Sequence, residues 1–124
     1  MHEMGLCGRI IGCAIGVHTA LGPGLLETAY EHCLEHELIL NGLCVERQKA
    51  FPIRYRDEVV DAAMRLDLLV EGRVIVELKT VEELGRIHVA QAVTYLKLTG
   101  LRVCLLINFN THQLRRGGIR RVIV

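Results

Sequence analysis

Residues 65–79 read RLDLLVEGRVIVELK, two apolar runs on either side of the turn-forming residues 71–73 (EGR). Apolar and β-branched runs separated by a short glycine-containing turn predict a β-hairpin. Because side chains alternate across a strand, Glu77 and Lys79 share one face. Antiparallel pairing about this turn sets Asp67 directly opposite Glu77. The hairpin therefore gathers two acids and one base at one place.

The length of the turn decides whether the two carboxylates meet. A three-residue turn at 71–73 pairs residues whose numbers add to an even value, which puts Asp67 and Glu77 on one face. A two-residue turn at 71–72 would oppose Asp67 to Val76 and send Glu77 to the other face. We predict the three-residue turn.

Charged side chains within such apolar strands need partners, because an unpaired buried charge is costly. Two carboxylates that meet repel unless a cation lies between them, and hard oxygen ligands suit Mg²⁺ or Mn²⁺. Asp67 and Glu77 are therefore candidate ligands of such a metal, with Lys79 beside it. The alternative is a buried ion pair of Lys79 with either acid, without a catalytic role.

Outside the hairpin, apolar periodicity and turn residues divide the chain into helices and strands. Helices are predicted from Ile10 to the break at 22–24 (GPG), from this break to Asn41-Gly42, and over Ile87–Leu98. Strands are predicted at Cys44–Tyr55, Glu58–Asp61, Arg65–Val70, Val74–Lys79, Arg102–Asn108 and Gly118–Val124. This order predicts an α/β fold, and 124 residues are enough for one domain, 1–124.

Composition and charge narrow the class of protein. The five cysteines form no CxxC pair, which argues against a disulfide framework or a zinc ribbon. The longest uncharged stretch, 10–26, is interrupted by glycine and proline and is too short to span a bilayer, so we expect a cytoplasmic protein. From Leu84 to Val124 there are seven basic residues and no acid. This segment is either a phosphate-facing surface or a solvated edge.

Several motifs occur in an order known from one protein family. Residues 24–30 (GLLETAY) have the pattern GxxExxY, and Asp67 precedes residues 77–79 (ELK). Further matches are 67–70 (DLLV), 75–79 (IVELK), His88-x-x-Gln91-x-x-x-Tyr95-Leu96 and 105–109 (LLINF). The ordered set resembles the GxxExxY family of the PD-(D/E)XK nuclease superfamily over residues 9–124. Leu66 stands in place of the superfamily's proline, and Cys104 in place of an expected glycine.

The resemblance implies a restriction-endonuclease-like core, a central mixed sheet flanked by helices in the order αβββαβ. It implies that Asp67, Glu77 and the main-chain carbonyl of Leu78 hold Mg²⁺ or Mn²⁺, while Lys79 orients or deprotonates the attacking water. Glu27 resembles the helical acid that completes metal coordination in many members. The alternative for Glu27 is a helix-end charge that complements the macrodipole.

Substrate contacts are also implied. Gln91 and Tyr95, with His88 one turn earlier, resemble a QxxxY motif of related nucleases; the alternative is a polar stripe that covers the sheet. Tyr30 and His18 would line the same pocket or serve as core residues. The arginines expected to contact phosphates are Arg115, Arg116, Arg120 and Arg121.

The prediction is thus a metal-dependent nuclease that cleaves nucleic acid, DNA rather than RNA, with no membrane partner and with a homodimer as an option. The alternative is a non-catalytic nucleic-acid-binding or assembly module that retains the fold.

Overall fold

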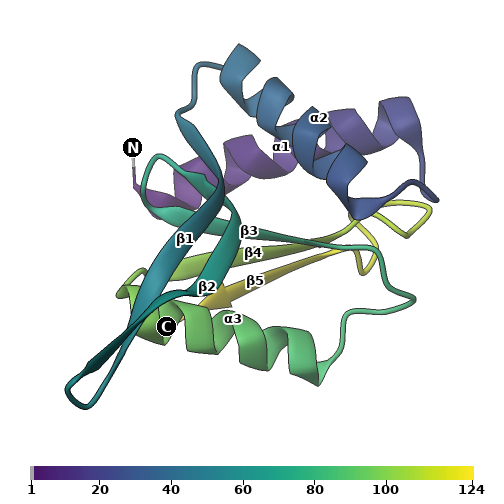
Figure 1. Ribbon diagram of the computed structural model, residues 1–124. Coiled ribbons are helices and arrows are strands. Elements are labelled where there is room, and N and C mark those ends of the chain that lie inside the picture. The colour runs from purple at the N-terminus through teal and green to yellow at the C-terminus, as the bar shows by residue number, and fades with distance from the viewer. Residues whose placement is uncertain (1) are drawn as a thin grey trace.

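A computed structural model describes residues 2–124, and it shows a mixed five-stranded sheet between two helical layers (Figure 1). The elements are α1 (Glu3–Leu21), α2 (Glu27–Leu40), β1 (Val45–Tyr55), β2 (Glu58–Val70), β3 (Val74–Lys79), α3 (Arg86–Thr99), β4 (Val103–Asn108) and β5 (Ile119–Ile123). The strands lie in the order β1-β2-β3-β4-β5. Only the β3–β4 pair is parallel. The predicted α/β fold is confirmed.

The two faces of the sheet are covered by different helices. In β3, Val74, Val76 and Leu78 pack into the core cluster beneath α1 and α2, whereas Ile75 belongs to the cluster beneath α3. All residues of β3 except Lys79 are buried, because a neighbouring strand lies on each side and helices lie above and below. The central position of β3 therefore explains why its sequence is almost continuously apolar.

Helix α1 begins earlier than predicted. The predicted start was Ile10, but the helix begins at Glu3, where the side chain of His2 accepts a hydrogen bond from the main-chain nitrogen of Met4. By length and composition α1 would suffice to cross a membrane. Seven of its residues are nevertheless buried in the molecule, as in the core helix of a globular protein: Leu6, Cys7, Ile10, Cys13, Ala14, Val17 and His18.

Strand β2 is one continuous strand, whereas two strands were predicted on either side of residues 62–64. The register of the β1–β2 pair shifts between Phe51 and Ile53, and Ala62 adopts a positive φ of 53°. A bulge thus absorbs the extra residues and the strand runs on. Beyond the bulge, residues 54–63 are exposed on both faces, and the hairpin extends past the end of the sheet (Figure 1).

Candidate active site

The predicted hairpin register is confirmed, and the strands separate where the two acids lie. Val70 pairs with Val74 and Leu68 with Val76, after which the regular β2–β3 ladder ends. Beyond that point the main-chain nitrogen of Asp67 donates to Oε2 of Glu77 at 2.8 Å. The main-chain nitrogen of Leu78 donates to Oδ2 of Asp67, also at 2.8 Å. Each carboxylate therefore takes the place of a main-chain carbonyl and holds the opposite strand.

The carboxylates repel one another in a poorly solvated place. Glu77 is 3% exposed. Burial, reinforced by the charge of Asp67, raises the pKa of Glu77 to about 8. Burial also raises the pKa of Asp67. Deprotonation of both acids is therefore unfavourable unless a cation compensates their charge.

Lys79 is held by the amide of Gln91. The Lys79 ammonium donates to Oε1 of Gln91 at 2.9 Å, and Nε2 of Gln91 donates to the Tyr95 hydroxyl at 3.3 Å. Among residues 2–124, Lys79 forms no ion pair with Asp67 or Glu77. The geometry therefore does not match the buried-ion-pair alternative. Gln91 and Tyr95 thus lie beside the strand that carries Glu77. Burial and the charge of Glu77 raise the pKa of Tyr95.

Helix α2 brings further acids to the same place. Glu27 is its first residue, and its pKa is raised by burial and by the nearby charge of Asp67. Glu31 lies one turn later, is 2% exposed and pairs with Arg47 at 3.1 Å. Sequence reasoning missed Glu31, although its spacing of four residues from Glu27 was a usable signal.

Gln48 links these acids and was also missed. Its Nε2 lies 3.0 and 2.9 Å from the two carboxylate oxygens of Glu31 and 3.4 Å from Oδ1 of Asp67. Gln48 has a positive φ of 54° and interrupts the β1–β2 ladder opposite Asp67. No sequence pattern identifies a glutamine in this left-handed conformation, because the conformation depends on the sheet around it.

A comparison with protein-family sequence models identifies the family of the chain. The sequence model described as PD-(D/E)XK nuclease superfamily matches residues 5–122. The chain belongs to this superfamily. Among curated proteins no match is found.

A solved structure described as "Crystal structure of SSO0001" has a similar fold, with a TM-score of 0.53 and 20% sequence identity. The match covers 78% of this chain and 50% of that chain, so the present chain spans half the length of its structural neighbour. At this identity the likeness concerns the fold alone.

Tyr30, expected among the substrate contacts, lies inside this PD-(D/E)XK domain. Its side chain is 0% exposed and stacks on Phe109 with 4.5 Å between ring centroids. Its hydroxyl donates to the Gly22 carbonyl at 2.5 Å and accepts from the Leu25 nitrogen at 3.1 Å. A fully buried ring cannot touch a substrate, so Tyr30 instead fixes the loop that leads to Glu27.

Replacing Tyr30 with phenylalanine should lower the free energy of unfolding by about 1–2 kcal/mol, since two loop groups lose their partner. Urea denaturation measures this effect. Tyr55→Phe is the matched control, because Tyr55 is 63% exposed and should tolerate the change. Equal stability of the two variants would contradict the structural role.

His88 and the predicted arginines occupy separate places. Nδ1 of His88 accepts a hydrogen bond from the Gly85 nitrogen at 2.8 Å and so caps α3. Arg115 and Arg116 lie in the β4–β5 loop, residues 109–118. Arg120 and Arg121 are neighbours in β5 and so point to opposite faces of the sheet. The four arginines do not form one surface.

The donor groups fit a hard divalent cation. Asp67 and Glu77 each use one carboxylate oxygen for a main-chain contact, and the second oxygen of Glu77 accepts no hydrogen bond within residues 2–124. In this part of the chain no group of three or more acidic, histidine or cysteine side chains is arranged to hold a metal ion. A metal would therefore draw on both carboxylates and on main-chain oxygen, the ligand chemistry that Mg²⁺ and Mn²⁺ prefer.

Proposed function

We propose that this protein is a metal-dependent nuclease that hydrolyses nucleic-acid phosphodiester bonds through Asp67, Glu77 and Lys79. One observation carries the proposal. At the point where β2 and β3 separate, two mutually repelling carboxylates lie together, and burial raises the pKa of Glu77 to about 8. Membership of a nuclease superfamily supports the same reaction class.

Asp67, Glu77 and the main-chain carbonyl of Leu78 would hold Mg²⁺ or Mn²⁺, and Glu27 would complete the coordination. The bound ion would stabilise charge on the phosphate and lower the pKa of the attacking water. Burial and the charge of Asp67 raise the pKa of Glu27, which supports this role of the helix acid.

Lys79 is the residue of the chain that would contribute a positive charge to the reaction. With Gln91 holding its ammonium group, Lys79 would orient the water and neutralise a non-bridging oxygen of the scissile phosphate. Water attacks phosphorus in line with the departing oxygen and releases a proton to solvent as the new P–O bond forms. The P–O bond to the departing oxygen breaks, and that oxygen takes up a proton from solvent. No covalent intermediate with the protein is formed.

The test is incubation of the purified protein with single- and double-stranded DNA and RNA in Mg²⁺, Mn²⁺ or a chelator. We expect cleavage with either metal, no cleavage in chelator, and DNA to be cut in preference to RNA. Ca²⁺ serves as a control that supports binding by oxygen ligands. Binding of nucleic acid without cleavage of any substrate would instead indicate the non-catalytic binding module.

A further inference from the structure

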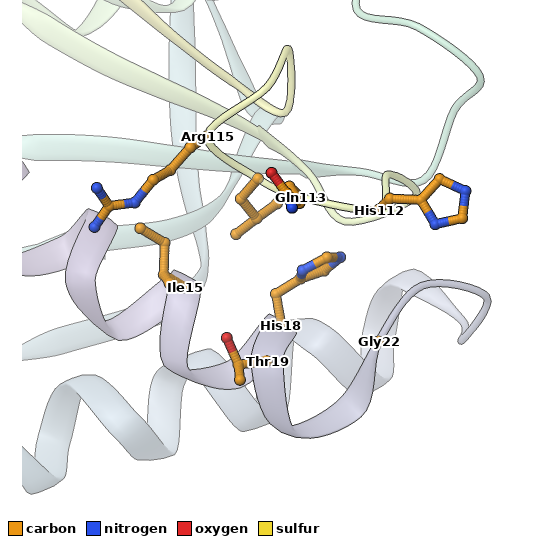
Figure 2. Close-up of a pocket in the computed structure, with 8 residues that line it drawn as sticks. Ile15, His18, Thr19, Gly22, His112, Gln113 and Arg115 are labelled. Atoms are coloured by element: carbon orange, nitrogen blue, oxygen red, sulfur yellow. The ribbon is translucent and has the colours of Figure 1, made fainter.

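A cavity of about 400 Å³ lies between the C-terminal end of α1 and the β4–β5 loop (Figure 2). Its lining combines two apolar side chains with polar and basic ones and contains no acid: Ile15, His18, Thr19, Gly22, His112, Gln113, Leu114 and Arg115. The charge and the hydrogen-bonding groups of this lining suit an anionic ligand.

His18 gives the cavity a fixed, buried polar wall. The side chain is 7% exposed, and its Nε2 lies 2.8 Å from the carbonyl oxygen of Thr111. A carbonyl only accepts, so Nε2 carries the hydrogen. Within residues 2–124 the other ring nitrogen, Nδ1, has no hydrogen-bond partner. Figure 2 shows the ring on the cavity side of α1, facing the loop that carries Gln113.

The cavity lies near the C-terminal ends of β3 and β4, as does the candidate active site. Phe109 follows β4, and its main-chain nitrogen donates to the carbonyl of Lys79 at 3.0 Å. The ring of Phe109 lies 6.0 Å from that of His18. Gly22 lines the cavity, and its carbonyl accepts a hydrogen bond from the Tyr30 hydroxyl in the loop before Glu27. A nucleic-acid strand that crosses this end of the sheet would therefore pass both places.

We propose that this cavity binds a phosphate-bearing nucleotide of the nucleic acid that is bound at the candidate active site. The inference rests on the proposed function and adds a subsite to it. Arg115 and Thr19 donate to the phosphate, and the imidazole of His18 lines the same wall. The volume exceeds that of a phosphate and falls within the range of small-molecule pockets. The remaining space, between Ile15 and Leu114, accepts the sugar or part of the base.

Neighbouring arginines provide a matched test. Arg115 lines the cavity, whereas Arg116, its neighbour and also exposed, does not. Oligonucleotide binding is measured in chelator. Arg115→Ala should weaken affinity about tenfold. It should also lower by about one the magnitude of the salt slope, which is the slope of the logarithm of the binding constant against the logarithm of salt concentration. Arg116→Ala removes the same charge and should change affinity less than twofold. Thr19→Val, which changes no charge, should weaken affinity about threefold without altering the salt slope.

Two sources of the phosphate can be distinguished. If the cavity takes a terminal phosphate, a 5′-phosphorylated oligonucleotide should bind more tightly than its hydroxyl form, and Arg115→Ala should abolish the difference. If it takes an internal phosphate, neutralising one phosphate as a methylphosphonate should weaken binding of wild-type protein but not of Arg115→Ala. Either pattern supports the subsite.

Equal effects of Arg115→Ala and Arg116→Ala, with no effect of Thr19→Val, would overturn the subsite. If wild-type protein cleaves and both cavity variants cleave at unchanged KM, the subsite is wrong and the nuclease remains. If wild-type protein cleaves no substrate but the cavity variants alone lose affinity, the nuclease is wrong and the subsite remains.

Discussion

Lys79→Ala should reduce the cleavage rate by about 10²–10⁴-fold while nucleic-acid affinity falls no more than a few-fold. General acid–base catalysis and charge stabilisation by one positioned group are typically of this size. Lys79 is half-buried and donates only to Gln91, so its removal breaks no salt bridge within the described residues. The folded state should therefore survive, and loss of rate would report on chemistry.

Single-turnover cleavage and binding in chelator measure the two effects separately. Lys97→Ala is the control, because Lys97 is exposed near the end of α3 and its substitution removes an equal charge. A Lys79→Ala protein that is folded and cleaves within threefold of wild type would remove Lys79 from the reaction. A parallel loss of affinity and rate would assign it to binding.

Glu77→Gln should abolish metal-dependent cleavage and yet stabilise the metal-free protein at alkaline pH. The pKa of Glu77 is about 8 in the folded state and near 4.5 in the unfolded chain. Between these values the folded state holds a proton that the unfolded chain has released, so the free energy of unfolding falls as pH rises from about 4.5 to 8. The loss is on the order of 3–5 kcal/mol and is complete above pH 8.

Glutamine can still accept the main-chain hydrogen bond of Asp67 and cannot ionise, so this loss should disappear in the variant. Urea denaturation in chelator at pH 5.5 and 8.5 measures it. Glu83→Gln is the control, because Glu83 is exposed in the loop before α3. Mg²⁺ should raise the stability of wild-type protein at pH 8.5 and leave Glu77→Gln unchanged. A variant whose stability falls with pH as steeply as wild type would disprove the assignment.

The central hairpin could be predicted from sequence because its information is local. Glu71 and Gly72 both adopt positive φ, and the three-residue turn sets the register that brings Asp67 and Glu77 together. The placement of Gln48 and Glu31 could not be predicted in this way, because both depend on contacts between α2 and the sheet. A buried acid paired with an arginine of another element leaves no periodic signal.

Two other sequence-based predictions differ from the structure because they depend on where the strands and loops lie. Arg120 and Arg121 are adjacent in sequence, and the alternation of side chains in β5 separates them. Tyr30 is the last residue of the GxxExxY pattern, but its hydroxyl holds the loop between α1 and α2. A motif residue can thus act on the site through the backbone that it holds.

Between β2 and β3, two carboxylates accept hydrogen bonds that main-chain carbonyls accept in a regular sheet. This restricts which substitutions the domain can tolerate at these two positions. Asp67 and Glu77 each close a contact between β2 and β3, so an apolar substitution would strand a buried main-chain nitrogen even in a descendant that no longer cleaves anything. Asparagine and glutamine are the tolerable replacements. Lys79 holds no main-chain group within residues 2–124, where its ammonium donates to the Gln91 side chain. Among inactive descendants the lysine should therefore be lost first, and its presence is a better marker of a working enzyme than the two acids.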